Sequence, residues 1–210
     1  PVFPDHYRLG LREKTLIVFV GDNGTGRFGA DRSFLNGRKI QGQKGTMLEG
    51  GSRVPLLASW KGTMPEGRVM NDLIDFTDFF ATFAELAGAK MPEGITMDSH
   101  SFAPQLRGEK GTPRDWVYVQ LGGKWYVCDH EFKLNRRGDL FDMTDAPFVQ
   151  KPISADTKDE AAVAGRRRLQ AVLDTLSPAT GKTVDPEAQR ANQGRRRQAE
   201  RAPQDLESVR

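Results

Sequence analysis

Two short, uninterrupted apolar runs in the first third of the chain predict strands. Residues 15–20 read Thr-Leu-Ile-Val-Phe-Val and end at Gly21, and residues 54–60 read Val-Pro-Leu-Leu-Ala-Ser-Trp. A β-branched apolar run without polar alternation is typical of a strand that is buried on both faces. Such strands belong mainly to α/β sheets with helices on both sides, so the first run predicts a strand of that kind.

A helical pattern follows at residues 72–87. Its apolar positions recur at three- and four-residue steps and are Leu73, Phe76, Phe80, Phe83 and Ala87. Gly88 lies where a C-terminal cap belongs, and Thr77 and Asp78 are candidates for the N-cap. We expect the phenylalanine stripe to pack in the core rather than to bind a cofactor.

From residue 116 the pattern changes to short strands separated by turn signals. We predict four strands, at residues 116–120, 125–128, 132–134 and 140–143. Gly122-Gly123 and Arg137-Gly138-Asp139 are the turns, so the strands should form a small antiparallel sheet. A helix is predicted over residues 156–176.

The change of pattern divides the chain into three predicted parts. Residues 11–115 should belong to an α/β domain, and residues 116–178 should form a subdomain with the small sheet and its helix. Residues 179–210 carry few large apolar side chains. We therefore expect the last part to be a disordered or frayed tail.

Composition excludes several classes of function. The 210 residues are 37% hydrophobic, with 31 basic against 28 acidic side chains. Because these charges are interleaved, the chain lacks a general nucleic-acid surface. Neither a membrane-spanning run nor a targeting signal is present. A start at Pro1 suggests a piece of a longer protein, and the single Cys128 excludes an internal disulfide and a cysteine-based metal cage.

Oxygen-bearing side chains follow the first predicted strand directly. Asp22 and Asn23 lie just beyond its carboxyl end, where open α/β sheets bind ligands. A carboxylate and an amide oxygen suit a hard cation such as Ca²⁺. The alternative is a turn in which both side chains bond their own backbone, and the dipeptide alone favours that turn.

A glycine-rich loop over residues 24–52 carries a second candidate, Lys44. A loop of this length in a compact domain is either functional or disordered. Lys44 opens the string Lys-Gly-Thr-Met-Leu-Glu-Gly-Gly-Ser-Arg-Val-Pro. A lysine beside glycine can deliver a point charge to an anion, although a solvated surface lysine is the common alternative.

Taken together, these features resemble the family of type I sulfatases. The resemblance rests on a buried strand, Asp-Asn-Gly, a loop and the string from Lys44 to Pro55. It extends over about residues 11–176 and includes Phe132-Lys133-Leu134. It implies an α/β fold with an alkaline-phosphatase-like mixed sheet, present in part, and a small C-terminal antiparallel sheet.

The resemblance also implies roles for individual residues. Asp22 and Asn23 would be ligands of an active-site calcium ion, and Lys44 would be a catalytic residue that binds the sulfate group. Glu49 and Arg53 would be a structural pair that holds the loop. The substrate would be a sulfated small molecule or glycan, and the location would be periplasmic or secreted.

One part of the family pattern is missing from this chain. Family members carry a Cys-x-Pro-x-Arg motif whose cysteine becomes the formylglycine nucleophile, whereas Cys128 is followed by Asp-His-Glu-Phe. The remaining calcium ligands also lie upstream in the family. We therefore expect the C-terminal portion of a sulfatase, inactive without an N-terminal half that carries formylglycine.

Two alternatives stay open from the sequence. An enzyme of the same superfamily could hydrolyse phosphate or phosphonate esters, because a metal and a lysine serve either anion. A non-catalytic binding module could also retain this scaffold. The sequence upstream of Pro1 would discriminate among the three.

Overall fold

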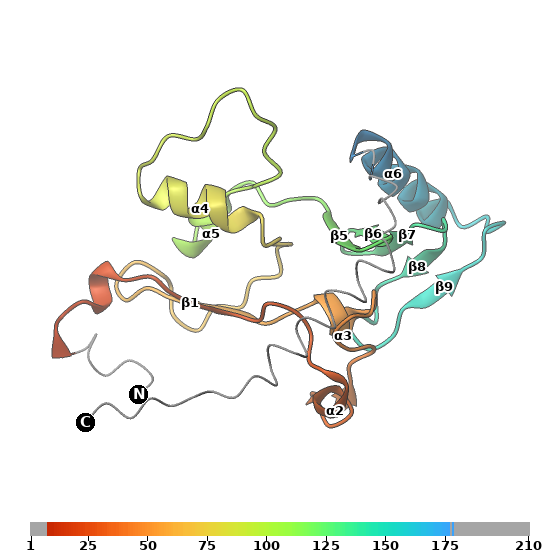
Figure 1. The fold of residues 1–210 in the computed structure, drawn as a ribbon, viewed down its shortest axis with the longest axis horizontal. Coiled ribbons are helices and arrows are strands. Elements are labelled where there is room, and N and C mark those ends of the chain that lie inside the picture. The colour runs from red at the N-terminus through yellow and green to blue at the C-terminus, as the bar shows by residue number, and fades with distance from the viewer. Residues whose placement is uncertain (1–7, 177, 179–210) are drawn as a thin grey trace, which may run out of the picture.

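The computed structural model describes residues 8–176 and 178, so the predicted tail at 179–210 lies outside the described residues. A short 3₁₀ helix η1 (Arg12–Lys14) leads into strand β1 (Ile17–Val20). Strand β1 pairs antiparallel with β4 (Leu56–Ser59), and both predicted strands of the first third are confirmed. Figure 1 shows this ribbon on one side and a larger sheet on the other.

The long loop between β1 and β4 contains four short elements. They are α2 (Arg27–Ala30), β2 (Phe34–Leu35), β3 (Arg38–Lys39) and α3 (Glu49–Ser52). Strands β2 and β3 form a two-stranded antiparallel hairpin. The loop is therefore folded rather than structureless.

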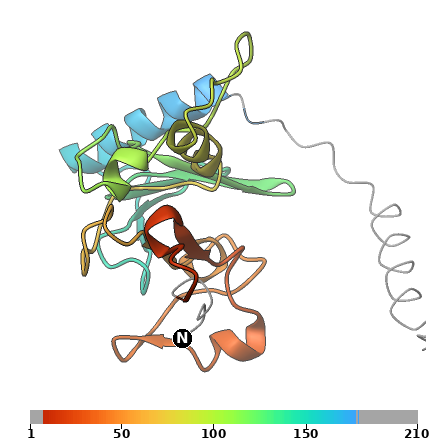
Figure 2. The ribbon, with the colours of Figure 1, turned by 90° about the vertical axis from the view of Figure 1, so that its left-hand side faces the viewer.

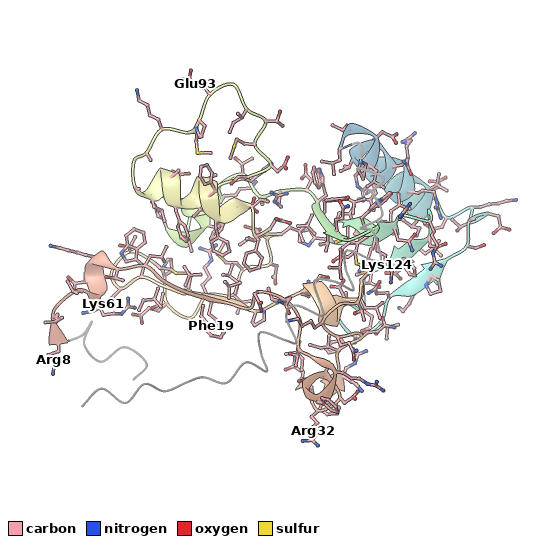
Figure 3. The ribbon with its side chains drawn as sticks, viewed as in Figure 1. Arg8, Phe19, Arg32, Lys61, Glu93 and Lys124 are labelled. Carbon is pink, nitrogen blue, oxygen red and sulfur yellow. The ribbon has the colours of Figure 1, made fainter. Side chains whose placement is uncertain are left out.

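The prediction that the first strand is buried on both faces is wrong for one face. Phe19 is 65% exposed, and its cross-strand neighbour Leu57 is 59% exposed. Phe19 lies on the side of β1 that faces away from α4 (Figure 3). The physical reason is that β1 and β4 form a ribbon of two strands, and no layer of described residues covers this side.

Helix α4 (Asp78–Leu86) confirms the predicted helix with a later start, and Gly88 follows it with a φ of +65°. The expectation that its phenylalanine stripe packs in the core is wrong. Phe76, Phe80 and Phe83 are each about half exposed, whereas Asp78 and Thr82 are buried. The buried positions of the helix are Asp78, Ala81 and Thr82, and an ion pair of Asp78 holds this face inward.

That ion pair joins Asp78 to Arg114. The Arg114 guanidinium donates to both carboxylate oxygens of Asp78, at 2.9 and 2.5 Å. The backbone N–H of His100 donates to the same carboxylate at 2.8 Å. Helix α5 (Ala103–Leu106) lies beside α4. Because a buried carboxylate needs such partners, they decide which face of α4 turns inward.

The second half of the chain forms one antiparallel sheet. Its strands run in sequence order: β5 (Val117–Leu121), β6 (Lys124–Cys128), β7 (Phe132–Asn135), β8 (Leu140–Asp142) and β9 (Lys151–Ile153). The four predicted strands are confirmed within one residue at either end. The sequence pattern does not predict β9, because Lys-Pro-Ile lacks alternation. Proline is tolerated in β9 because this strand lies at the edge of the sheet.

Helix α6 (Glu160–Leu176) covers one face of this sheet, as Figure 2 shows. Its Leu169 and Leu173 pack against apolar side chains of the strands, which include Val127, Leu134 and Leu140. The Asp159 carboxylate accepts a hydrogen bond from the Ala162 amide at 2.8 Å and so caps the helix. Among the described residues, no helix has the length and apolar character needed to cross a bilayer.

The α6 interface is the main apolar core, so its loss should destabilise the chain measurably. Leu169→Ala removes a fully buried side chain and should lower the free energy of unfolding by about 3 kcal/mol. Val163→Ala, on the exposed side of the same helix, should cost less than about 1 kcal/mol. Urea unfolding followed by circular dichroism measures both. Equal effects of the two substitutions would contradict this location of the core.

Candidate functional site

Asp22 and Asn23 lie in the bend directly after β1, at its carboxyl end. The Asp22 side chain is exposed and Asn23 is partly buried. Within the described residues, neither side chain takes part in a hydrogen bond or an ion pair. The turn in which both side chains bond their own backbone is therefore not what the structure shows. Their oxygens remain available to a ligand.

Lys44 lies in a turn that the backbone joins to the bend after β1. The Lys44 amide donates to the Thr25 carbonyl oxygen at 2.9 Å, two residues beyond Asn23. A second bond runs from the Gly24 amide to the Gly51 carbonyl oxygen at 3.0 Å. The Lys44 side chain is exposed and pairs with no carboxylate of the described residues. The two candidate segments are thus neighbours through their main chains.

Glycines make this close approach possible. A Cβ atom at Gly24 would overlap the carbonyl oxygen of Gly50, and one at Gly51 would overlap the carbonyl oxygen of Thr46. At Gly50 it would lie 2.5 Å from the carbonyl oxygen of Gly42. Real Cβ atoms do not approach that closely, so these positions require glycine for space. Such a requirement could have been suspected from the repeated glycines of the string.

The predicted structural pair of Glu49 and Arg53 is confirmed. Glu49 is the first residue of α3, and its carboxylate lies 3.4 Å from the Arg53 guanidinium. The Arg53 amide also donates to the Glu49 carbonyl oxygen at 2.8 Å. Glu49 is buried while Arg53 is exposed, so the pair joins the first residue of α3 to its C-cap residue within the loop.

A contact from the C-terminal sheet was not foreseen from the sequence. Lys133 of β7 donates through Nζ to the Met47 carbonyl oxygen at 2.8 Å and lies 3.2 Å from the Glu49 carboxylate. The signal in the sequence is slight: a lysine between Phe132 and Leu134, which alternation places on the face of the strand opposite to these two apolar side chains. The loop that carries Lys44 is therefore supported from the second half of the chain.

The donor set after β1 fits part of a hard-cation site. A carboxylate and an amide oxygen, both unengaged, are ligands that calcium accepts. Calcium takes six to eight oxygens, and Asp22 and Asn23 provide only two side-chain ligands. Among residues 8–176, no group of three or more histidine, cysteine or acidic side chains could hold a metal. Asp22 and Asn23 therefore fit a calcium coordination shell that needs further ligands from other residues.

Cys128 lies buried in β6, as predicted for a small core residue. Burial raises the pKa of its thiol to about 12, and the Glu49 carboxylate adds to the effect. A thiol with this pKa stays protonated at neutral pH, and only the thiolate is an effective nucleophile. Cys128 is therefore not the nucleophile of a hydrolytic reaction in this fold.

Substitution at Gly24 tests the packing of the two candidate segments. Gly24→Ala should lower the free energy of unfolding by about 1–3 kcal/mol, because its methyl group overlaps the Gly50 carbonyl oxygen. Gly26→Ala is the matched control, since no atom lies near a Cβ at that position and its φ of −60° suits alanine. Denaturant unfolding measures both. A neutral Gly24→Ala would show that the segments do not pack in this way.

Thiol labelling tests the burial of Cys128. At pH 8 the native chain should react with an aromatic disulfide reagent roughly a thousandfold more slowly than the unfolded chain. The reason is the raised thiol pKa together with the loss of access. The same reaction in guanidinium chloride gives the reference rate. Equally fast labelling of the native chain would contradict a buried thiol.

Comparison with known sequences supports the resemblance that the motifs suggested. The family model described as Sulfatase matches residues 7–89. Human arylsulfatase A is 39% identical over 110 residues, which covers 52% of this chain and 21% of that protein. The chain thus spans about a fifth of the length of this curated relative.

Comparison with solved structures shows the fold. A structure described as a putative sulfatase from Bacteroides thetaiotaomicron VPI-5482 matches with a TM-score of 0.58 and 22% identity, covering 79% of this chain and 37% of that one. A protein solved with its substrate D-glucosamine-2-N,6-O-disulfate matches with a TM-score of 0.62 and 21% identity, covering 88% and 38%. The expected α/β fold class is confirmed. Residues 7–89 of this chain therefore match the sulfatase family, and the fold of the chain is similar to that of solved sulfatases.

Proposed function

We propose that this chain is the C-terminal portion of an enzyme that hydrolyses sulfate esters, and that Asp22, Asn23 and Lys44 belong to its active site. The observation that carries the proposal is the 2.9 Å bond from the Lys44 amide to the Thr25 carbonyl oxygen. It joins the lysine turn to the bend that holds Asp22 and Asn23. The family match spans all three residues.

Lys44 would bind the sulfuryl oxygens of the substrate. Its ammonium group has no carboxylate partner among the described residues, so its charge is not neutralised within the chain. Negative charge builds on the transferred group and the leaving oxygen during hydrolysis. A positive group held in place stabilises that charge more than it stabilises the bound ester, which raises the rate.

Asp22 and Asn23 would hold a divalent cation, and their oxygen chemistry favours calcium. When bound, the cation supplies positive charge next to the sulfuryl group. The Asp22 carboxylate and the Asn23 amide oxygen would hold it at the carboxyl end of β1. Two protein ligands do not retain calcium tightly, so the upstream half of the enzyme would complete the shell.

The nucleophile would also come from the upstream half, as formylglycine. Within this chain, Cys128 is buried and lies outside the required motif. The residues described above bind and orient a sulfate ester but leave no group to attack sulfur. Activity of the isolated chain is therefore not expected.

The proposed substrate is a sulfated small molecule or glycan. One structurally similar protein was solved with its substrate D-glucosamine-2-N,6-O-disulfate, and the human relative is an arylsulfatase. Both names refer to sulfated compounds, and Lys44 and a cation would stabilise the negative charge of a sulfuryl group. We also propose a periplasmic or secreted location on the basis of the family.

Activity measurements on the 210-residue chain test whether the nucleophile comes from the upstream half of the enzyme. The chain should show no turnover of a chromogenic aryl sulfate, with or without added calcium, because its sequence lacks the Cys-x-Pro-x-Arg motif that supplies the family's nucleophile. The matched measurement uses the same chain joined to a sulfatase N-terminal half with formylglycine, which should be active. Calcium-stimulated hydrolysis by the short chain would contradict the proposal. Turnover of an aryl phosphate in place of the sulfate would favour a phosphoryl enzyme.

Substitution of Lys44 tests its role in the completed enzyme. Lys44→Ala should lower kcat by about 100-fold and raise KM by a smaller factor, because the charge acts mainly in the transition state. Lys124→Ala is the control, since Lys124 is an exposed lysine at the start of β6. Steady-state kinetics with an aryl sulfate separate the two parameters. An unchanged kcat for Lys44→Ala would remove Lys44 from the active site.

A further inference from the structure

The sheet β5–β9 has a second face, opposite to α6, and this face carries polar side chains. Phe132 and Leu134 of β7 belong to the apolar core with α6, so Lys133 between them points to the other side. Cys128 of β6 pairs with Lys133 across the strands, and Tyr126 lies two residues before Cys128 on the same face. The Lys133 side chain is only 3% exposed. A lysine buried to this extent requires partners for its charge.

Lys133 finds these partners in the loop that follows Lys44. Its Nζ donates to the Met47 carbonyl oxygen at 2.8 Å and to the Glu49 carboxylate at 3.2 Å. The same nitrogen lies 3.7 Å from the centre of the Tyr126 ring, a cation–π contact. The two hydrogen bonds of Lys133 join residues more than 80 positions apart in the sequence.

A second link runs parallel to the first. The Tyr126 hydroxyl and the Ser52 hydroxyl share a hydrogen bond of 2.6 Å. Ser52 ends α3, and Glu49 begins it, so both ends of this short helix are tied to the second face of the sheet. In Figure 1, α3 lies between the end of β1 and the sheet β5–β9.

We propose that Lys133 is a positioning residue for Lys44: it anchors the loop over residues 43–53 to the C-terminal sheet and so keeps the Lys44 turn beside Asp22 and Asn23. The inference rests on the proposed function of Lys44. Met47 lies three residues after Lys44, and its carbonyl oxygen is the point that Lys133 holds. Through Lys133, the sheet β5–β9 thereby helps to position the ammonium group of Lys44.

The anchor must be a charged donor rather than an apolar side chain. From the sheet, the Lys133 ammonium group contacts both the Met47 carbonyl oxygen and the Glu49 carboxylate. Burial lowers the pKa of Lys133, while the Glu49 carboxylate beside it favours the charged form. Methionine would fill the same volume without donating a hydrogen bond. It would leave the Met47 oxygen without this donor and the Glu49 charge with only the exposed Arg53.

Hydrogen exchange of the 210-residue chain tests the anchoring without any activity. In Lys133→Met, the amides of Lys44 and Gly50, which bond to Thr25 and Gln41, should exchange at least about tenfold faster. Amides of α6 should be unchanged. Lys124→Met, an exposed lysine of the same sheet, is the control and should alter neither. Unchanged protection of the loop in Lys133→Met would overturn the inference.

A second variant keeps the test decisive if Lys133→Met fails to fold. The double substitution Lys133→Met with Glu49→Gln removes both charges, so that no uncompensated carboxylate remains beside the sheet. It should fold, retain exchange protection in α6 and show the same faster exchange at Lys44 and Gly50. Full protection of these amides in the double variant would also overturn the inference.

A double-mutant cycle in the completed enzyme separates positioning from general stability. Lys133→Met should lower kcat for an aryl sulfate by about tenfold, and Lys133→Arg should restore part of it. In a Lys44→Ala background, Lys133→Met should cause no further loss, since the residue that it positions is gone. Independent, additive losses would overturn the inference and leave the proposed function intact. An unchanged kcat for Lys44→Ala alone would overturn the proposed function, and the inference with it.

Discussion

The backbone of Gly24 lies against that of Gly50 and Gly51, without room for a side chain between them. This contact brings the end of β1, with its oxygen-bearing side chains, next to the turn that presents Lys44. Backbone hydrogen bonds from Gly24 to Gly51 and from Lys44 to Thr25 complete it. The proposed active site depends on that approach, because separately the two segments are an ordinary bend and an ordinary loop.

The C-terminal sheet serves two purposes through its two faces. One face packs against α6 and forms the apolar core, which supplies the burial that stabilises this half of the chain. The other face offers Lys133 and Tyr126 to α3 and the preceding loop. A short helix of four residues has little stability of its own. The position of α3 is therefore determined by these contacts with the sheet, which the apolar core with α6 stabilises.

The first half of the chain is held in part by buried polar contacts and leaves apolar surface open. The buried pair of Asp78 and Arg114 docks α4, while phenylalanines of the same helix remain about half exposed. Phe19 and Leu57 form a further exposed apolar pair on β1 and β4. Apolar side chains that are exposed on a helix and on a two-stranded ribbon would be covered by a further layer of protein. This exposure accords with the proposal that the active site is completed by an upstream half.

Local patterns in the sequence determined strands β1 and β4, four strands of the C-terminal sheet and the two longest helices, α4 and α6, and they pointed to the candidate ligands. Periodicity and turn residues report which side chains share a face, and the string from Lys44 to Pro55 carried the family resemblance. The tertiary structure decided which faces are covered: the inward side of α4 follows from Arg114, a residue 36 positions from Asp78. It also decided the role of Lys133, whose partners lie 84 and 86 positions away. Periodicity describes one segment at a time, whereas a buried charge is placed by partners that only the folded chain brings within hydrogen-bonding distance.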